Sequence, residues 1–286
     1  MKSSAKDDSM ILPDGRTLAY AEYGIPDGKP LLFFHGTPGS RLEQHPDHNI
    51  AKALGIRMIV PERPGYGHSD PQPGRSFLQW TDDMEYFMDQ LGLEHCAIAG
   101  FSGGGPYAMG CAHRMPERIT RLGLISSIAP FDNPYGTEGM NAQSLALYGL
   151  AQADPDTFNA QIQALATSGD SVYQIMTAGL PEPDSQIFTN TDMETMYREN
   201  MIEAVHSGVA GIVSDMLLIP KKWEFRPEDI RCETSLWQGL ADINVPPDMG
   251  KYLNQAIPDC SATFLPGEGH FLLFTHWKKI LATVTA

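Results

Sequence analysis

Short apolar runs alternate with longer segments of helical periodicity near both ends of the chain. Continuous apolar runs are typical of strands that are buried on both faces of a parallel sheet. The alternation therefore predicts an α/β fold: a mostly parallel, doubly wound sheet with helices on both faces. The expected strands cover residues 16–22, 30–34, 57–60, 96–99, 122–126, 234–238 and 262–266, and the clearest helices cover 50–54, 80–91 and a segment that ends near 115.

The alternation stops in the middle of the chain, between about residues 129 and 227. Strand signals disappear there and helical periodicity takes over, and Thr191 with Glu194 predicts a capping box at the start of one helix. We therefore expect a core made of residues 1–128 and 228–286 and a helical unit inserted after the sixth strand, residues 129–227.

Composition and charge limit the classes of partner. The length of 286 residues and the 42% hydrophobic content suffice for one large domain with an insertion. A formal net charge of −15 argues against nucleic acid or an anionic membrane as a partner. No stretch approaches the length of a membrane span, so we expect a soluble, cytoplasmic protein. The four cysteines lack C-x-x-C spacing and are expected to be free thiols.

The segment Gly100-Phe101-Ser102-Gly103-Gly104 places one hydroxyl between a predicted strand and a predicted helix. Glycines two residues before and after the serine allow a tight turn in which a Cβ would collide. Such a turn exposes the Ser102 hydroxyl and leaves the N–H of Gly103 at a helix N-terminus, where partial positive charge suits an oxyanion. Taken alone, the pentapeptide is explained equally well by a glycine-rich loop.

These residues resemble the G-x-S-x-G nucleophile elbow of the α/β-hydrolases, whose triad follows in the order serine, acid, histidine. Asp242 lies in a loop after a predicted strand, in a setting that resembles the family's G-x-x-D-x-x-V-P segment. His270 follows the last predicted strand. Singly, such an Asp is more often a helix N-cap and such a His a core residue. Together, the three predict a Ser102-His270-Asp242 triad, because a serine hydroxyl needs an imidazole base and the imidazole needs a carboxylate.

A second resemblance to the family lies in His35-Gly36-Thr37-Pro38-Gly39, which follows a predicted strand. The resemblance implies that the N–H groups of Thr37 and Gly103 form an oxyanion hole and that His35 braces its loop. The candidate substrate contacts are His35, Phe101, Met196 and Met201.

Two positions leave the assignment open to other interpretations. Asp132, which follows the expected strand at residues 122–126, is a rival for the triad acid, since some relatives carry the carboxylate there. We prefer Asp242 because its surrounding motif matches. Glu62 stands where the family's D-x-P-G-x-G-x-S loop has its usual Asp, which leaves the structural role of the loop plausible.

Metal and cofactor motifs are weak. His45-Pro46-Asp47-His48 contains ligand types, but its proline prevents helical presentation and no further partner is evident. No dinucleotide-binding or P-loop motif is present. We expect a reaction with neither a metal nor a cofactor.

The resemblance implies a capped serine hydrolase that cleaves a small-molecule carboxylic ester or lactone, with the helical unit as the cap. Methionines in that unit would suit a bulky apolar substrate, such as a macrolide. Amidase or peptidase, carbon–carbon bond hydrolase and cofactor-free haloperoxidase activities use the same triad and stay open. A slow-turnover small-molecule receptor of the same fold is an alternative from another class. Oligomeric state is not predicted.

Overall fold

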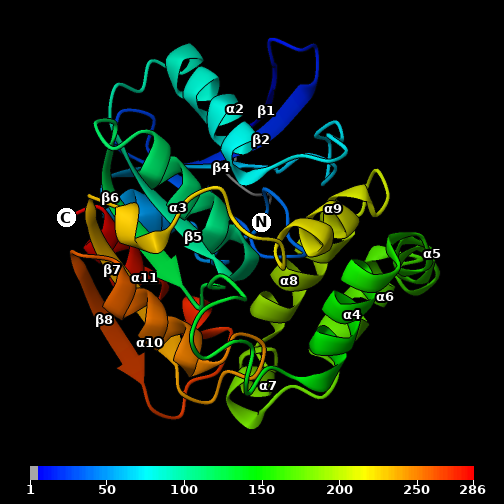
Figure 1. Ribbon diagram of the computed structural model, residues 1–286. Helices are drawn as coiled ribbons and strands as arrows, with labels where there is room; N and C mark the ends of the chain where they lie inside the picture. Colours follow the sequence, from blue (N-terminus) through cyan, green and yellow to red (C-terminus); the bar gives the residue numbers. More distant parts are fainter. Residues whose placement is uncertain (1–5) are drawn as a thin grey trace.

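A computed structural model describes residues 6–286 and shows a mostly parallel eight-stranded sheet with helices on both faces (Figure 1). The strand order is β1-β2-β4-β3-β5-β6-β7-β8. Strand β2 pairs antiparallel with β1 and β4, and the other neighbouring strands are parallel. The predicted fold class is confirmed.

The strands are β1 Lys6–Ile11, β2 Thr17–Gly24, β3 Lys29–Phe34, β4 Ile56–Pro61, β5 Cys96–Phe101, β6 Ile119–Ile125, β7 Glu233–Gly239 and β8 Cys260–Leu265. The helices of the core are α1 Asn49–Ala53, α2 Phe77–Gln90, α3 Gly105–Arg114, α10 Pro247–Ala256 and α11 Leu272–Val284. Two short 3₁₀ turns cover Ser102–Gly104 and Pro227–Asp229.

The two faces of the sheet pack against different helices. Side chains of α2, α3 and α10 form one hydrophobic cluster with one face, and those of α1 and α11 form a second cluster with the other. The central strand β5 is buried along its whole length, as its continuous apolar run predicts. All four cysteines are free thiols.

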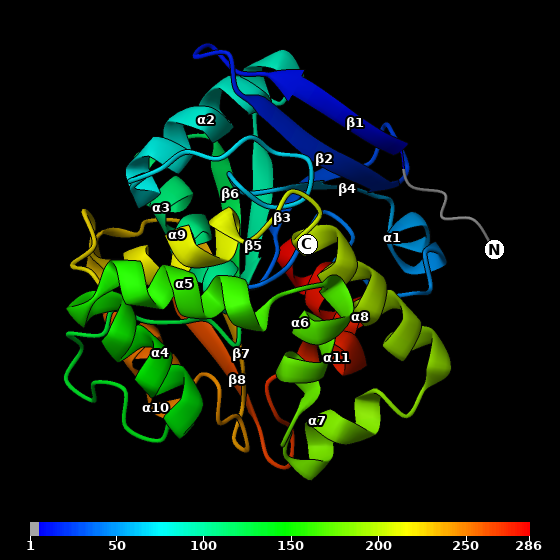
Figure 2. The same ribbon diagram turned by 90° about the vertical axis from the view of Figure 1, so that its right-hand side faces the viewer.

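Six helices lie between β6 and β7, within residues 129–227, which we call the helical insertion. They are α4 Ala142–Ala153, α5 Pro155–Leu165, α6 Gly169–Thr177, α7 Glu182–Ile187, α8 Thr191–Ala204 and α9 Ala210–Leu218. In Figures 1 and 2 these helices, drawn in green to yellow, stand outside the two layers that cover the sheet. No helix among residues 6–286 combines the length and hydropathy needed to cross a membrane.

Two local features differ from the sequence-based expectation. Strand β1 was not predicted, because its largely exposed segment Lys6–Ile11 lies at the sheet edge and carries no apolar run. The expected capping box at Thr191 is wrong by one residue. Asn190 is the N-cap of α8, and its side chain accepts hydrogen bonds from the N–H groups of Asp192 and Met193. Asparagine caps helices as well as threonine does, so composition alone did not separate them.

A pair of glycine substitutions tests the packing at the turn after β5. A Cβ on Gly104 would lie 2.3 Å from the carbonyl oxygen of Phe34, so we expect Gly104→Ala to destabilise the fold by at least about 2 kcal/mol through backbone displacement. The matched control is Gly149→Ala in α4, where a Cβ meets no atom within 4 Å. That change should stabilise by up to about 1 kcal/mol. Urea unfolding measures both, and equal effects would contradict the packing argument.

Candidate active site

Ser102 follows the last residue of β5 and begins the 3₁₀ turn that leads into α3. Its φ of 52° lies in the left-handed region, which a non-glycine residue adopts at a cost. The turn is tight because a Cβ on Gly100 would lie 2.5 Å from the carbonyl oxygen of Gly104. The two glycines therefore permit the approach of strand and helix that holds Ser102 at the apex.

His270 and Asp242 complete a hydrogen-bonded relay with Ser102. The Nε2 atom of His270 lies 3.1 Å from the Ser102 hydroxyl oxygen, and its Nδ1 atom lies 2.9 Å from Asp242 Oδ2. Burial opposes a charge on His270, but the carboxylate of Asp242 outweighs it and raises the pKa of the imidazole above its ordinary 6.5. This arrangement fits an imidazole that accepts the proton of the serine and is stabilised as a cation.

Asp242 is held by its own loop. Its Oδ1 atom accepts hydrogen bonds from the N–H groups of Asn244 and Val245, both at 2.9 Å. The side-chain amide of Gln238 donates to Oδ2 at 3.2 Å. Asp132 is exposed, and the carboxylate that contacts the His270 ring is that of Asp242.

Thr37 lies beside the turn that carries Ser102. A Cβ on Gly103 would lie 2.3 Å from Thr37 Oγ1 and 3.5 Å from Thr37 N, so the backbones of the two predicted oxyanion donors are neighbours. The Thr37 hydroxyl donates to Asp215 Oδ2 at 2.7 Å and accepts from Arg63 Nη2 at 3.0 Å. Side-chain hydrogen bonds therefore fix the loop that carries Thr37, the first predicted donor.

Asp215 of α9 is the centre of a buried charge network between the helical insertion and the core. Its Oδ2 atom accepts from Arg63 Nη2 at 2.7 Å and from the hydroxyl of Tyr66 at 2.8 Å. Its Oδ1 atom accepts from Arg75 and from the hydroxyl of Tyr107. Burial alone would raise the pKa of this carboxyl, but the two guanidinium groups hold it below the ordinary range. The carboxylate is thus ionised and paired.

Asp184 of α7 binds the main chain of the loop that carries His270. Its two oxygens accept hydrogen bonds from the N–H groups of His270, at 3.0 Å, and Phe271, at 2.8 Å. A Cβ on Gly269 would lie 2.3 Å from Asp184 Oδ2, so a side chain at this position would displace the Asp184 carboxylate. Burial raises the pKa of the Asp184 carboxyl, and the two N–H groups oppose that effect.

Asn200 of α8 makes a third connection, to the loop after β3. Its Oδ1 atom accepts from the N–H and hydroxyl of Ser40, and its amide donates to Glu43 at 3.3 Å. Glu43 also accepts from the N–H of Gly36, beside Thr37. Burial raises the pKa of Glu43 to about 7. Three insertion side chains therefore reach the two loops that carry Thr37 and His270.

The predicted substrate contacts differ in placement. His35 is fully buried, with Nδ1 at 2.9 Å from the carbonyl of Gly36 and Nε2 accepting from the N–H of Arg63. Phe101 packs beside the His270 ring, with centroids 5.0 Å apart. Met196 and Met201 belong to the hydrophobic cluster of the α11 face, and Met201 is fully buried. Their contact with a substrate stays a prediction.

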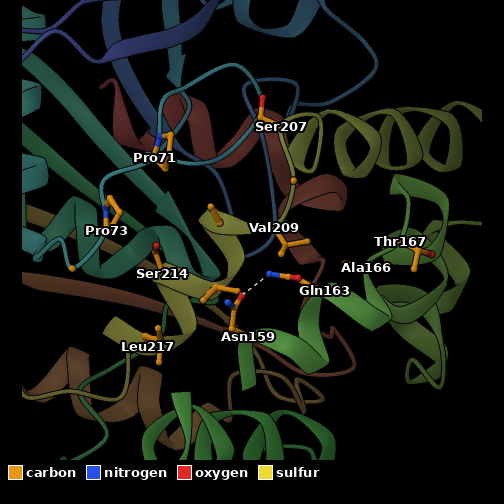
Figure 3. A pocket seen from close by; sticks show the side chains of 14 residues that line it. Pro71, Pro73, Asn159, Gln163, Ala166, Thr167, Ser207, Val209, Ser214 and Leu217 are labelled. Carbon is orange, nitrogen blue, oxygen red and sulfur yellow. Dashed lines mark hydrogen bonds between the residues drawn. The ribbon is translucent and has the colours of Figure 1, made fainter. Parts of the chain in front are cut away.

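Two cavities border the helical insertion. One, of about 290 Å³, lies between the insertion and the Asp242 loop, and Leu147, Met176, Leu180, Ile243 and Asn244 help to line it. The other, of about 660 Å³, lies between α5, α9 and residues 71–74, and Figure 3 shows Asn159 and Gln163 on its wall. Neither lining includes Ser102, Asp242 or His270, but that of the smaller cavity includes Ile243 and Asn244, which directly follow Asp242 in the chain.

Sequence reasoning missed the polar side chains of the insertion. Asp215 interrupts the apolar segment from Gly211 to Leu218, and a lone charge in such a run is a usable sign of a buried ion pair. Asp184 gives no such sign, because an acidic residue in the first turn of a helix is common.

The predicted weakness of the 45–48 segment as a metal site is untested. There the Nδ1 atoms of His45 and His48 face Asp47 N and Gln44 Nε2.

Comparison with known proteins assigns the family. A model of the alpha/beta hydrolase fold matches residues 29–276, most of the chain. The chain belongs to the α/β hydrolase family. This hydrolase is 27% identical over 268 residues to the AB hydrolase superfamily protein YisY of Bacillus subtilis, covering 90% of each chain.

Solved structures share the fold of this α/β hydrolase. The enol-lactonase from Burkholderia xenovorans LB400 superimposes with a TM-score of 0.73 at 18% identity, covering 97% of this chain and 99% of the other. The esterase EaEST from Exiguobacterium antarcticum superimposes with a TM-score of 0.72 at 18% identity, covering 98% of this chain and 100% of the other. At these identities the likeness establishes the fold and leaves the reaction to be argued from the site.

The Asp215 network generates a stability prediction for this hydrolase. Asp215→Asn leaves two buried guanidinium groups without their counter-charge, so we expect a loss of about 3–5 kcal/mol in the free energy of unfolding. The pKa of Asp215 is held below 3.8 in the folded state, so this stabilisation is complete at neutral pH and fades as the pH falls below 3.8.

The control for Asp215 is Asp248→Asn, which breaks an exposed ion pair with Lys251 and should cost less than about 1 kcal/mol. Denaturant midpoints at pH 7 compare the two. A loss at Asp215 no larger than at Asp248 would contradict the assignment of the network as a main connection between insertion and core.

Proposed function

We propose that this α/β hydrolase cleaves carboxylic esters or lactones through an acyl-enzyme. The observation that carries the proposal is the relay from Ser102 through His270 to Asp242, with both heavy-atom distances within hydrogen-bonding range. A serine that is bonded to a buried imidazole, itself bonded to a carboxylate, is equipped for nucleophilic attack on an acyl carbonyl.

The proposed reaction has two half-steps. Ser102 attacks the carbonyl carbon while His270 accepts its proton, and the N–H groups of Thr37 and Gly103 stabilise the oxyanion. The imidazolium then gives the proton to the leaving alcohol, and the ester bond breaks. Water repeats the sequence on the acyl-enzyme, which releases the acid and restores Ser102. For a lactone, the released alcohol stays part of the same molecule.

The substrate class is inferred from the cavity that borders the loop after Asp242. In this proposal the helical insertion acts as a cap, and the cavity beside Asp242 receives the apolar part of the substrate against Leu147, Met176 and Leu180. Its volume of about 290 Å³ suits a small or medium-sized acyl or alcohol group. The names of an enol-lactonase and an esterase among similar structures agree with ester chemistry.

Loss of the nucleophile is the first test. Ser102→Ala should lower kcat/KM for nitrophenyl acetate and butyrate by on the order of 10⁴-fold or more, while circular dichroism stays unchanged. Ser261→Ala, an exposed serine in β8, is the matched control and should keep full activity. Mass spectrometry of wild type with a slow ester should reveal one acyl group. If Ser102→Ala kept a tenth of the activity, the mechanism would be wrong, and a single slow turnover in wild type would favour the receptor alternative.

A pH profile tests the base. His270 must be neutral to accept the serine proton, and its pKa is raised above 6.5, so activity is lost as the pH falls through that raised value. We expect the acid limb of kcat/KM to have its midpoint above pH 6.5. Asp242→Asn should lower both the rate and this midpoint. A midpoint that did not move would show that Asp242 does not act on the catalytic base.

A further inference from the structure

His68, Glu203 and His206 meet at the surface where the helical insertion contacts the core. One ligand atom from each residue lies within 4.8 Å of the other two. His68 Nε2 is 3.2 Å from Glu203 Oε1, and the two imidazole rings have centroids 4.1 Å apart. The three side chains come from two segments that are distant in the sequence: His68 from the loop after β4, and Glu203 and His206 from the end of α8 and the turn that follows it.

The backbones that present these side chains are fixed to one another. The hydroxyl of Ser207 donates to the carbonyl of Gly67 at 2.7 Å, and the N–H of Gly67 approaches the carbonyl of Ala204 at 3.4 Å. The N–H of His68 also donates to the buried Glu62 carboxylate at 2.8 Å. His68 follows Gly67, and His206 precedes Ser207, so each histidine is next to a residue that joins the loop to the insertion. The backbones that carry the two histidines are therefore fixed relative to each other without a ligand.

The local charge favours a cation. Arg41 is the one guanidinium in the cluster, and it pairs with Glu203, with Glu62 at 2.8 Å and with Asp7 at 3.0 Å. Three carboxylates thus surround one guanidinium. Arg41 Nη1 donates to Glu203 Oε1, the same oxygen that faces His68 Nε2, and this bond holds the carboxylate at the cluster.

The donor set selects a class of ion. Two imidazoles and one carboxylate suit zinc and neighbouring transition metals, whereas calcium and magnesium prefer oxygen ligands. Metal–ligand bonds of about 2.0–2.1 Å in a tetrahedron place ligand atoms about 3.3 Å apart. The 3.2 Å between His68 Nε2 and Glu203 Oε1 already matches that edge. The exposed side leaves the fourth position to water.

We propose that His68, Glu203 and His206 form a binding site for zinc or a similar divalent transition metal, which joins the helical insertion to the core. None of the three ligands belongs to the Ser102 relay, so the ion takes no part in ester cleavage. Its effect is on stability: an ion that binds only the folded form shifts the unfolding equilibrium by mass action. The site is distinct from the 45–48 segment considered in the sequence.

Calorimetry on tag-free, chelator-treated protein at pH 8 tests the site. We expect one Zn²⁺ per chain, with no comparable binding of Mg²⁺. His68→Ala and His206→Ala should each weaken binding at least about tenfold, and Glu203→Gln should weaken it as well. His95→Ala is the matched control, because His95 is an exposed histidine beside Glu94 and lies outside the cluster.

Thermal unfolding supplies an independent readout. Zn²⁺ should raise the Tm of wild type and of His95→Ala and leave that of His206→Ala unchanged. Both variants change exposed histidines, so folding is checked by their metal-free Tm. The proposal is overturned if wild type binds no Zn²⁺ at about 100 μM, a concentration well above the Kd of a dedicated site. It is also overturned if His68→Ala and His206→Ala bind with the affinity of wild type.

Discussion

The ionised carboxylate of Asp215 is the constraint on which the arrangement of this hydrolase depends. Arg63 and Arg75 are buried in the core, and a buried guanidinium is tolerated only with a counter-charge. That counter-charge comes from the helical insertion. The insertion therefore cannot separate from the sheet without leaving charges on both sides unpaired. Since Thr37 binds the same carboxylate oxygen, the position of this predicted oxyanion donor depends on the ion cluster.

The sheet and the insertion contribute to the site in different ways. The sheet delivers Ser102, Asp242 and His270 to one edge, because each follows the carboxyl end of a parallel strand. The insertion then holds two of the loops at this edge. Asp184 accepts a hydrogen bond from the main-chain N–H of His270, and Asn200 binds the loop that carries Thr37. Contacts of this kind restrict the loops without touching the reacting atoms, which is how a supporting layer keeps catalytic geometry within narrow limits.

The strands of the core and the relay residues could be predicted because their signals are local. An apolar run, a glycine-flanked serine and an acid loop are each readable within a dozen residues. Asp215 and Arg63 are 152 residues apart in sequence, and the residues next to each of them do not indicate which side chain it pairs with. The same holds for Asp184 and His270. Strand β1 escaped prediction because an edge strand with exposed side chains needs no apolar pattern. The features that sequence analysis could not predict are therefore those that depend on contacts between distant residues, not on local structural propensity.

The contacts between Asp184 and the N–H groups of His270 and Phe271 have a consequence for recombination of such enzymes. In the proposed function the insertion both lines the substrate cavity and supports the loops of Thr37 and His270, so substrate preference and catalytic geometry would be inherited together. A chimera that exchanges residues 129–227 for the helices of another family member would carry a new pocket wall. It would also need equivalents of Asp184, Asn200 and Asp215 at matching places, or the recipient core would be left with two uncompensated arginines and an unsupported histidine loop.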